Sequence, residues 1–235
     1  MATQLVLGGL TIEVIRKDIK NIHLSVLPPM GAVRIAAPQR MRLDAIRLFA
    51  IAKLPWIRKH QRKLQAQERE SPRDYVERES HYLWGRRYLL RIIETNEAPL
   101  IEVRHRSIVM QVRPGTTQDR RAELLHGWHR DQIRQVVPDF LEKWQPLLRV
   151  KANRVFVQRM KTKWGSANPV RRTIRLNSEL AKKPQDCLEY VVLHELSHFL
   201  VPKHDKRFLN LLDGHMPNWR HIRHQLNSGQ LPSLR

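Results

Sequence analysis

One apolar segment near the C-terminus, which carries two histidines four residues apart, constrains this chain more than any other feature. Residues 191–200 read Val-Val-Leu-His-Glu-Leu-Ser-His-Phe-Leu. We expect a helix that begins near Pro184, because proline favours the first turn of a helix, and that runs to about Leu200. Residues four apart in a helix lie about 40° apart around its axis and about one turn apart along it. His194 and His198 can therefore bind one metal ion together.

Two further residues complete a candidate metal site. Glu195 lies about 100° around the helix from His194, so its carboxylate can reach a metal-bound water without binding the ion. His-Glu-x-x-His on a helix is the pattern of zinc metalloproteases, in which the glutamate acts as general base. Catalytic zinc has three protein ligands and one open position. We expect His204 to be the third ligand, because Pro202 should end the helix and a short loop can return His204 to the ion.

The competing interpretation of this pattern is a structural histidine pair on a core helix. With 12 histidines in 235 residues, the pattern arises in about 3% of shuffled chains, a risk that every short motif carries. The helical context and the spacing of His204 favour the metal site. Apolar neighbours would embed the helix and exclude water from it: Leu188, Val191, Val192, Leu196 and Phe199.

Composition limits the class of protein. A chain of 235 residues, 41% of them apolar, can form one or two domains with a real core. No run of about 18 apolar residues is present, so we expect no membrane-spanning helix. The single cysteine, Cys187, excludes an internal disulfide framework and is expected to be a small buried hydrophobe. Because the N-terminus also lacks an export signal, we expect a cytoplasmic, reducing environment.

The charge is strongly positive. Lys and Arg number 43 against 22 Asp and Glu, giving a net charge of +21, which favours association with polyanions. The excess is spread evenly, with 21 basic and 11 acidic residues over 1–117 and 22 and 11 over 118–235, and only 6% of the residues are aromatic. Two interpretations remain open: a generally basic solvated surface, and a nucleic-acid-associated protein whose charge is its main functional feature.

The pattern of apolar residues and turns predicts a mixed α+β protein with no internal sequence repeat. Residues 1–117 form a β-rich region with one helix over about residues 43–67, which Pro55 should kink or split. Residues 118–235 form a second domain that contains the metal-site helix. Its other expected parts are a helix over about 119–149 interrupted by Pro138, strands at 155–159 and 173–176, a loop at 164–169, and helical pieces at 206–212 and 217–226.

Several short stretches occur together in the C-terminal third. They are Lys-Trp-Gly-Ser at 163–166, Leu-Asn at 176–177, Tyr-Val-Val-Leu-His-Glu-Leu-Ser-His at 190–198, His-Asp-Lys-Arg-Phe at 204–208 and Met-Pro-Asn-Trp at 216–219. With Pro-Trp-Ile at 55–57, they make residues from about Arg16 to Leu226 resemble the YgjP-like metallopeptidases, a zincin group akin to the SprT and WLM metalloproteases. The chain departs from the family pattern at Ala167, where a cysteine often follows Trp-Gly-Ser.

The resemblance implies a zincin-like catalytic domain over residues 118–235 that holds one Zn²⁺ through His194, His198 and His204. It implies hydrolysis of peptide bonds in a peptide or protein by a zinc-activated water, with Glu195 as base. It also implies that a strand just upstream, at Thr173–Leu176, forms the edge along which an extended peptide docks. By analogy with SprT and WLM proteins, the substrates could be proteins bound to DNA.

Other residues have competing interpretations. A donor to the oxyanion could be Tyr190, a C-terminal histidine or Arg175, and the sequence does not choose. The cluster of His215, His221 and His224 is expected to have surface or packing roles, with support of the metal ligands as the minority interpretation. Capping or solvated roles are expected for Asp205 and Asp213, and packing roles for Trp164 and Trp219.

Overall fold

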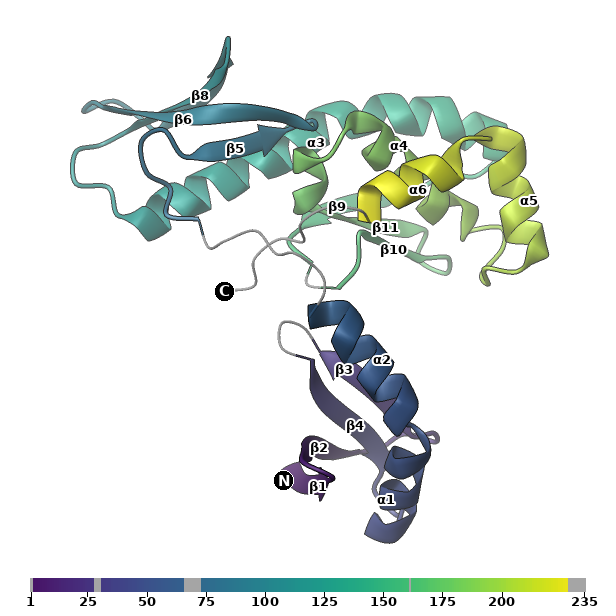
Figure 1. Ribbon diagram of the computed structural model, residues 1–235. Helices are drawn as coiled ribbons and strands as arrows, with labels where there is room; N and C mark the ends of the chain where they lie inside the picture. Colours follow the sequence, from purple (N-terminus) through teal and green to yellow (C-terminus); the bar gives the residue numbers. More distant parts are fainter. Residues whose placement is uncertain (1, 28–30, 66–72, 161, 228–235) are drawn as a thin grey trace. The chain divides into compact units, whose positions relative to one another are not determined.

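The computed structural model describes residues 2–27, 31–65, 73–160 and 162–227, and its contacts divide the chain into two units (Figure 1). The first lies within Met1–Glu70 and the second within Ser71–Gly229. Helices and β-sheets occur in both, which confirms the expected α+β class. The division falls earlier than the expected boundary after residue 117.

The first unit is a four-stranded sheet with two helices. Its elements are β1 (Ala2–Leu7), β2 (Leu10–Lys17), β3 (His23–Leu27), β4 (Ala32–Pro38), α1 (Leu43–Ala52) and α2 (Leu54–Gln65). The strand order is β1-β2-β4-β3, with β2 and β4 parallel and the outer pairs antiparallel. Alternate apolar side chains such as Ile12 and Ile35 face Ile46 and Ile57 of the helices and form the core.

The single helix expected over residues 43–67 is two helices, which separate at Lys53. Pro55 lies at the second position of α2, where its missing N–H leaves no helical hydrogen bond unmade. Of the two effects expected of Pro55, a kink or a split, the structure shows the split. Residues 66 and 67 lie outside the described residues.

The second unit begins with a sheet of the same topology. It comprises β5 (Ser80–Leu83), β6 (Arg86–Glu94), β7 (Leu100–Arg104) and β8 (Ser107–Val112), followed by α3 (Gln118–Leu148). The order β5-β6-β8-β7 and the strand directions repeat those of the first sheet. Leu90, Ile108 and Met110 pack with Leu125 of α3. This packing makes the sheet part of the second unit, so the division between the units falls after Glu70 and not after residue 117.

The hairpin between β5 and β6 also contacts the chain just before the histidine-bearing helix. The N–H of Trp84 donates to the carbonyl of Ala181 at 2.7 Å. Gly85 has a φ of +77°, and a Cβ there would lie 2.9 Å from Cγ of Pro184. Only glycine allows this approach together with a left-handed backbone.

Helix α3 continues through Pro138, contrary to the expected interruption. Pro138 and Arg134 are exposed, so water can bind the carbonyl of Arg134 that loses its donor. The preceding residues, Ile133 and Val137, lie about 100° around the helix and are buried in the core of the second unit. The packing of this face holds the helix together across the proline.

The remaining elements surround the helix that carries the two histidines. They are β9 (Arg154–Gln158), β10 (Gly165–Asn168), β11 (Thr173–Asn177), a 3₁₀ turn (Ser178–Lys182), α4 (Gln185–Ser197), α5 (Lys206–His215) and α6 (Trp219–Asn227). Nine residues of α4 are buried, on all of its sides. In the part of the chain that the structure describes, no helix is long and apolar enough to cross a membrane.

The three-stranded sheet differs from the expectation in two respects. Residues 164–169 were expected to form a loop, but β10 pairs antiparallel with β11 over Gly165–Asn168. Thr173–Leu176 was expected to be a free edge, yet β11 is the central strand, paired with β9 on its other side. The expected docking edge was therefore wrong, because both sides of β11 are already hydrogen-bonded.

Candidate metal centre

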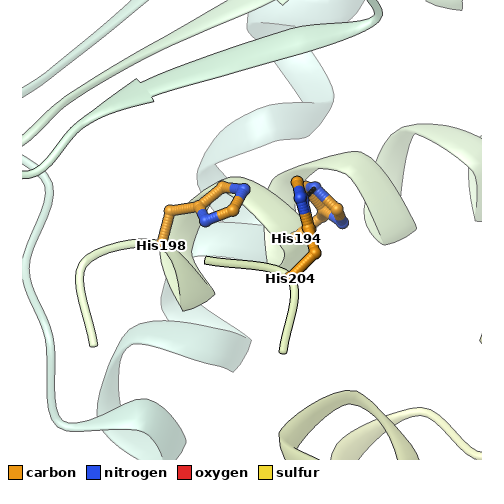
Figure 2. Close-up of side chains that lie close together, drawn as sticks. All are labelled: His194, His198 and His204. Atoms are coloured by element: carbon orange, nitrogen blue, oxygen red, sulfur yellow. Dashed lines mark hydrogen bonds between the residues drawn. The ribbon is translucent and has the colours of Figure 1, made fainter. Parts of the chain in front are cut away.

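The end of α4 positions two of the three histidines. His194 lies in its last turn, and His198 is the residue that caps it; the helix ends at Ser197, three residues before the expected end at Leu200. The N–H groups of Leu200 and Val201 both bond to the carbonyl of Ser197, which closes the turn after the helix. Both imidazoles project from one side of α4, as the spacing predicted (Figure 2).

His204 returns to the same point from the segment between α4 and α5. Asp205 caps α5, because its carboxylate accepts the N–H groups of Arg207 at 3.0 Å and Phe208 at 3.2 Å. This cap fixes the chain next to His204. Nε2 of His204 lies 3.0 Å from Nε2 of His194. One ring nitrogen from each of the three histidines lies within 4.8 Å of the others, a group that could hold a metal ion.

Phe208 forms an apolar floor against all three imidazoles. Its ring centroid lies 4.9, 4.8 and 4.8 Å from those of His194, His198 and His204. Its side chain is fully buried. The floor restricts the rings and excludes water from one side of the site, so an ion would meet solvent only from the opposite side.

Hydrogen bonds to Nδ1 leave Nε2 available on the two helix histidines. Nδ1 of His198 lies 3.2 Å from the carbonyl of Val201, to which its N–H can donate. Nδ1 of His194 lies 3.5 Å from the hydroxyl of Tyr190. Burial lowers the pKa of His194 to about 3, aided by the nearby His198 and His204, and burial also lowers the pKa of His198. Neutral imidazoles with outward Nε2 lone pairs are the donors that zinc requires, so these residues fit such an ion.

Glu195 lies beside the histidines and is enclosed by protein. Its side chain is 5% exposed, and burial raises its pKa to about 7 against the opposing charge of Lys163. Gly165 of β10 faces it closely, because a Cβ on Gly165 would lie 2.6 Å from Oε1 of Glu195. Glycine is therefore the residue that allows the strand to approach the carboxylate.

A cleft of about 400 Å³ opens over the histidines and Glu195. Lys163, Ser166 and Ala167 line it from the β10 side, and Pro202 lines it from the loop after α4. Among the described strands, β10 pairs with β11 only, so its other edge has unpaired backbone groups. A peptide-sized groove thus lies between a free strand edge and the histidine cluster.

Asn177 holds the start of β10 and was not singled out as a site residue from the sequence. Its side-chain NH₂ donates to the carbonyls of Met160 at 2.9 Å and Lys163 at 2.8 Å. Its side-chain oxygen accepts from the N–H groups of Met160 and Glu179, both at 3.2 Å. Gly165, Phe208 and Asn177 all lie in the stretches that carried the family resemblance, which is the only signal that could have indicated them.

The other residues weighed from the sequence lie outside the histidine cluster. His221 and His224 are exposed on α6, and His215 packs edge-on against Trp144 at 6.2 Å. Asp213 accepts from the indole N–H of Trp219 at 2.7 Å and pairs with Arg220. Cys187 is buried, and its burial raises the pKa of its thiol to about 11. The guanidinium of Arg175 lies over the ring of Phe156. The indole N–H of Trp164 donates to the side chain of Asn227, and the ring of Trp219 stacks on that of Tyr190.

A buried helix that brings His-Glu-x-x-His and a third histidine to one point is the architecture of a metallopeptidase. The sequence model of the YgjP-like metallopeptidase domain matches residues 20–229. The chain belongs to the YgjP-like family of metallopeptidases, and it is therefore a metal-dependent enzyme that acts on a peptide or protein.

Two solved structures resemble part of the chain. The metallopeptidase zymogen jannalysin of Methanocaldococcus jannaschii is 24% identical, with a TM-score of 0.35, and the match covers 38% of this chain and 86% of jannalysin. The metallopeptidase zymogen abylysin of Pyrococcus abyssi is 18% identical, with a TM-score of 0.36, over 40% of this chain and 98% of abylysin. No curated protein matches the sequence.

Proposed function

We propose that the protein is a zinc-dependent peptidase in which His194, His198 and His204 hold the ion and Glu195 is the general base. The observation that carries this proposal is the convergence of three imidazoles, with Nε2 of His204 3.0 Å from Nε2 of His194. Three imidazole nitrogens with one side open to a cleft suit catalytic zinc. The single buried thiol leaves no disulfide, which supports a reducing, cytoplasmic location.

The chain's own residues would divide the reaction between them. When bound, zinc supplies Lewis acidity, which activates water and polarises the scissile carbonyl. The Glu195 carboxylate takes the proton of the attacking water and passes it to the nitrogen of the leaving amine. The burial of Glu195 beside Gly165 keeps that carboxylate in one place and away from bulk water.

The free edge of β10 is the proposed substrate-binding strand. An extended peptide can add to this edge through main-chain hydrogen bonds, which require no particular side-chain sequence. Residues Gly165–Ala167 line the cleft that contains the histidines. A peptide on this edge would therefore present its backbone to Glu195.

The test compares the wild type with His204→Ala, Glu195→Gln and, as a matched histidine control, the exposed His224→Ala. We expect about one zinc per chain in the wild type, His224→Ala and Glu195→Gln after dialysis, and much less in His204→Ala. Hydrolysis of a fluorogenic peptide library should disappear in Glu195→Gln with metal content intact. Full activity in Glu195→Gln would contradict the role of this carboxylate.

A structural role for the metal is the alternative that the same samples test. Structural zinc contributes directly to folding, so a chelator would unfold the protein. We expect the chelated protein to keep its circular dichroism spectrum, because Phe208 and the Asp205 cap hold the ligand segment through protein contacts. Loss of folded structure on chelation would assign the ion a structural role instead.

A further inference from the structure

The first unit exposes a mixed apolar and basic surface on the outer side of its two helices, which we term the α1–α2 surface. Its apolar members are Leu48, Ile51 and Trp56, with side chains 68%, 46% and 40% exposed. Five exposed cations accompany them: Arg47, Lys53, Arg58, Lys59 and Arg62. Large apolar side chains gathered with cations on one surface are typical of protein interaction sites.

Helical periodicity places these side chains away from the sheet. Ile46 and Ala50 of α1 are buried against the sheet, whereas Leu48 and Ile51, three residues apart, lie together on the opposite side of the helix. In α2, Ile57 is buried and Lys59 points away from it. Figure 1 shows that the two helices follow one another in space, and α2 contacts both α1 and β3.

Trp56 is held in place on this surface. Its ring stacks on that of His60, with centroids 3.8 Å apart and planes inclined by 29°. Nδ1 of His60 in turn lies 2.9 Å from the carbonyl of Trp56, close enough to donate to it. A fixed aromatic side chain loses little conformational freedom when a partner binds it, so Trp56 is suited to anchor one.

The surface has almost no negative charge. Asp44 is the one acidic residue of α1, and Arg42 lies 3.8 Å from its carboxylate; α2 contains none. The described ion pairs of this unit join Arg34 to Glu13 and Arg42 to Asp44. Among the described residues, therefore, no carboxylate neutralises the five cations of the surface. Their charge is complementary to an acidic partner.

We propose that the α1–α2 surface is an exosite that binds an acidic, apolar-containing segment of a protein substrate. Carboxylates of that segment would pair with the cations, and its apolar side chains would pack on Leu48, Ile51 and Trp56. A nucleic acid would use the cations and could stack on Trp56, but its phosphates gain nothing from two aliphatic side chains. The proposal rests on the proposed peptidase function, since the bound segment belongs to the substrate.

The first test is binding, which needs neither hydrolysis nor a metal. Full-length protein is titrated into a fluorescein-labelled peptide of alternating glutamate and leucine residues, and anisotropy is measured. We expect the Leu48→Ser/Ile51→Ser and Lys59→Glu/Arg62→Glu variants each to bind about tenfold more weakly or worse. Arg106→Glu/Arg113→Glu, with the same change of charge on exposed residues of the second unit, should bind as the wild type does. Equal binding by all three variants would overturn the proposal.

The second test separates an exosite from other uses of the surface. With an unfolded acidic protein such as casein as substrate, both surface variants should raise KM and leave kcat unchanged, while hydrolysis of a short uncharged peptide stays at the wild-type rate. If neither the wild type nor any variant hydrolysed the short peptide, the peptidase function would be refuted, and the binding result would still stand.

Two outcomes would assign the surface a role other than binding a protein substrate. Tighter binding to oligo-dT or to phosphatidylserine vesicles than to the acidic peptide, lost in Lys59→Glu/Arg62→Glu but kept in Leu48→Ser/Ile51→Ser, would contradict a protein partner. A loss of stability in Leu48→Ser/Ile51→Ser well beyond the roughly 1 kcal/mol that two serines cost an exposed helix would indicate that the surface packs within the protein, and would equally overturn the proposal.

Discussion

The contact between Gly165 and Glu195 allows the role of the carboxylate to be tested without changing the carboxylate or a metal ligand. In Gly165→Ala, the new Cβ would lie 2.6 Å from Oε1 of Glu195 and 2.9 Å from both Cγ of Glu195 and Cγ1 of Val191. Ordinary contact begins at 3.4 Å, so the carboxylate must move by about 0.8 Å. Val191 is buried on α4 and leaves no room in the other direction.

The expected loss follows from that displacement. A shift of about 1 Å in a reacting group costs on the order of 100-fold in rate, and the crowding should lower the free energy of unfolding by about 1–3 kcal/mol. The assay is kcat/KM on a fluorogenic peptide, with zinc content and the thermal midpoint measured on the same samples. Zinc content should not change, because the three histidines are not crowded by the new methyl group.

The matched control is Gly214→Ala on α5. A Cβ there has nothing within 4 Å, and the backbone of Gly214 is compatible with alanine. This variant should keep wild-type activity. If Gly165→Ala were as active as Gly214→Ala, the position of Glu195 would not govern the rate, and the assignment of this carboxylate as the base would be refuted.

Three further predictions concern the support of the site and the response to pH. Asn177→Ala leaves several buried backbone groups without a partner, so we expect a loss of about 2–4 kcal/mol in the free energy of unfolding and a lower kcat at unchanged zinc content; unchanged kcat would show that the start of β10 needs no such anchor. Phe208→Ala should cost about 3–5 kcal/mol and weaken zinc binding in a chelator competition, and wild-type affinity would argue against an organising role for the ring. Burial lowers the pKa of His129 to about 3 in the folded protein. As the pH falls below about 6.5, His129 is therefore protonated in the unfolded chain but not in the folded one. The contribution of His129 to the free energy of unfolding is fully present above that pH, and at pH 5 the free energy of unfolding is about 2 kcal/mol lower. His129→Gln, which can still donate to Tyr82, should reduce this dependence in urea titrations at pH 7 and 5, and an unaltered dependence would mean that another group causes it.

The parts of the structure that the sequence predicted are those fixed by local geometry. The spacing of His194 and His198, and a loop short enough to return His204, involve eleven consecutive residues, and the structure brings their rings together. The break near Pro55 was predictable for the same reason, because a proline acts on its own helix.

The parts that were missed depend on contacts between distant residues. The Gly-Ser-Ala-Asn of β10 has no alternating apolar pattern and is a strand only because β11 pairs with it. The continuity of α3 depends on whether the carbonyl freed by Pro138 faces water or protein. The unit boundary depends on the packing of the second sheet against Leu125 of α3, and the repeated strand order depends on backbone pairing between strands, so neither can be read from a local stretch of sequence.

Local sequence geometry and contacts between distant residues both determine the structure of the histidine cluster. The motif supplies histidines at the correct spacing, yet their final positions depend on α4 being buried on all sides, on the floor formed by Phe208 and on the Asp205 cap. These contacts order the imidazoles before any ion arrives, so the fold carries the conformational entropy cost of assembling the site. An ion that finds its ligands already converged binds without having to organise the chain. This is why the Phe208 variant, which changes no ligand, should weaken zinc binding by disturbing all three imidazoles together, whereas a histidine variant removes only one.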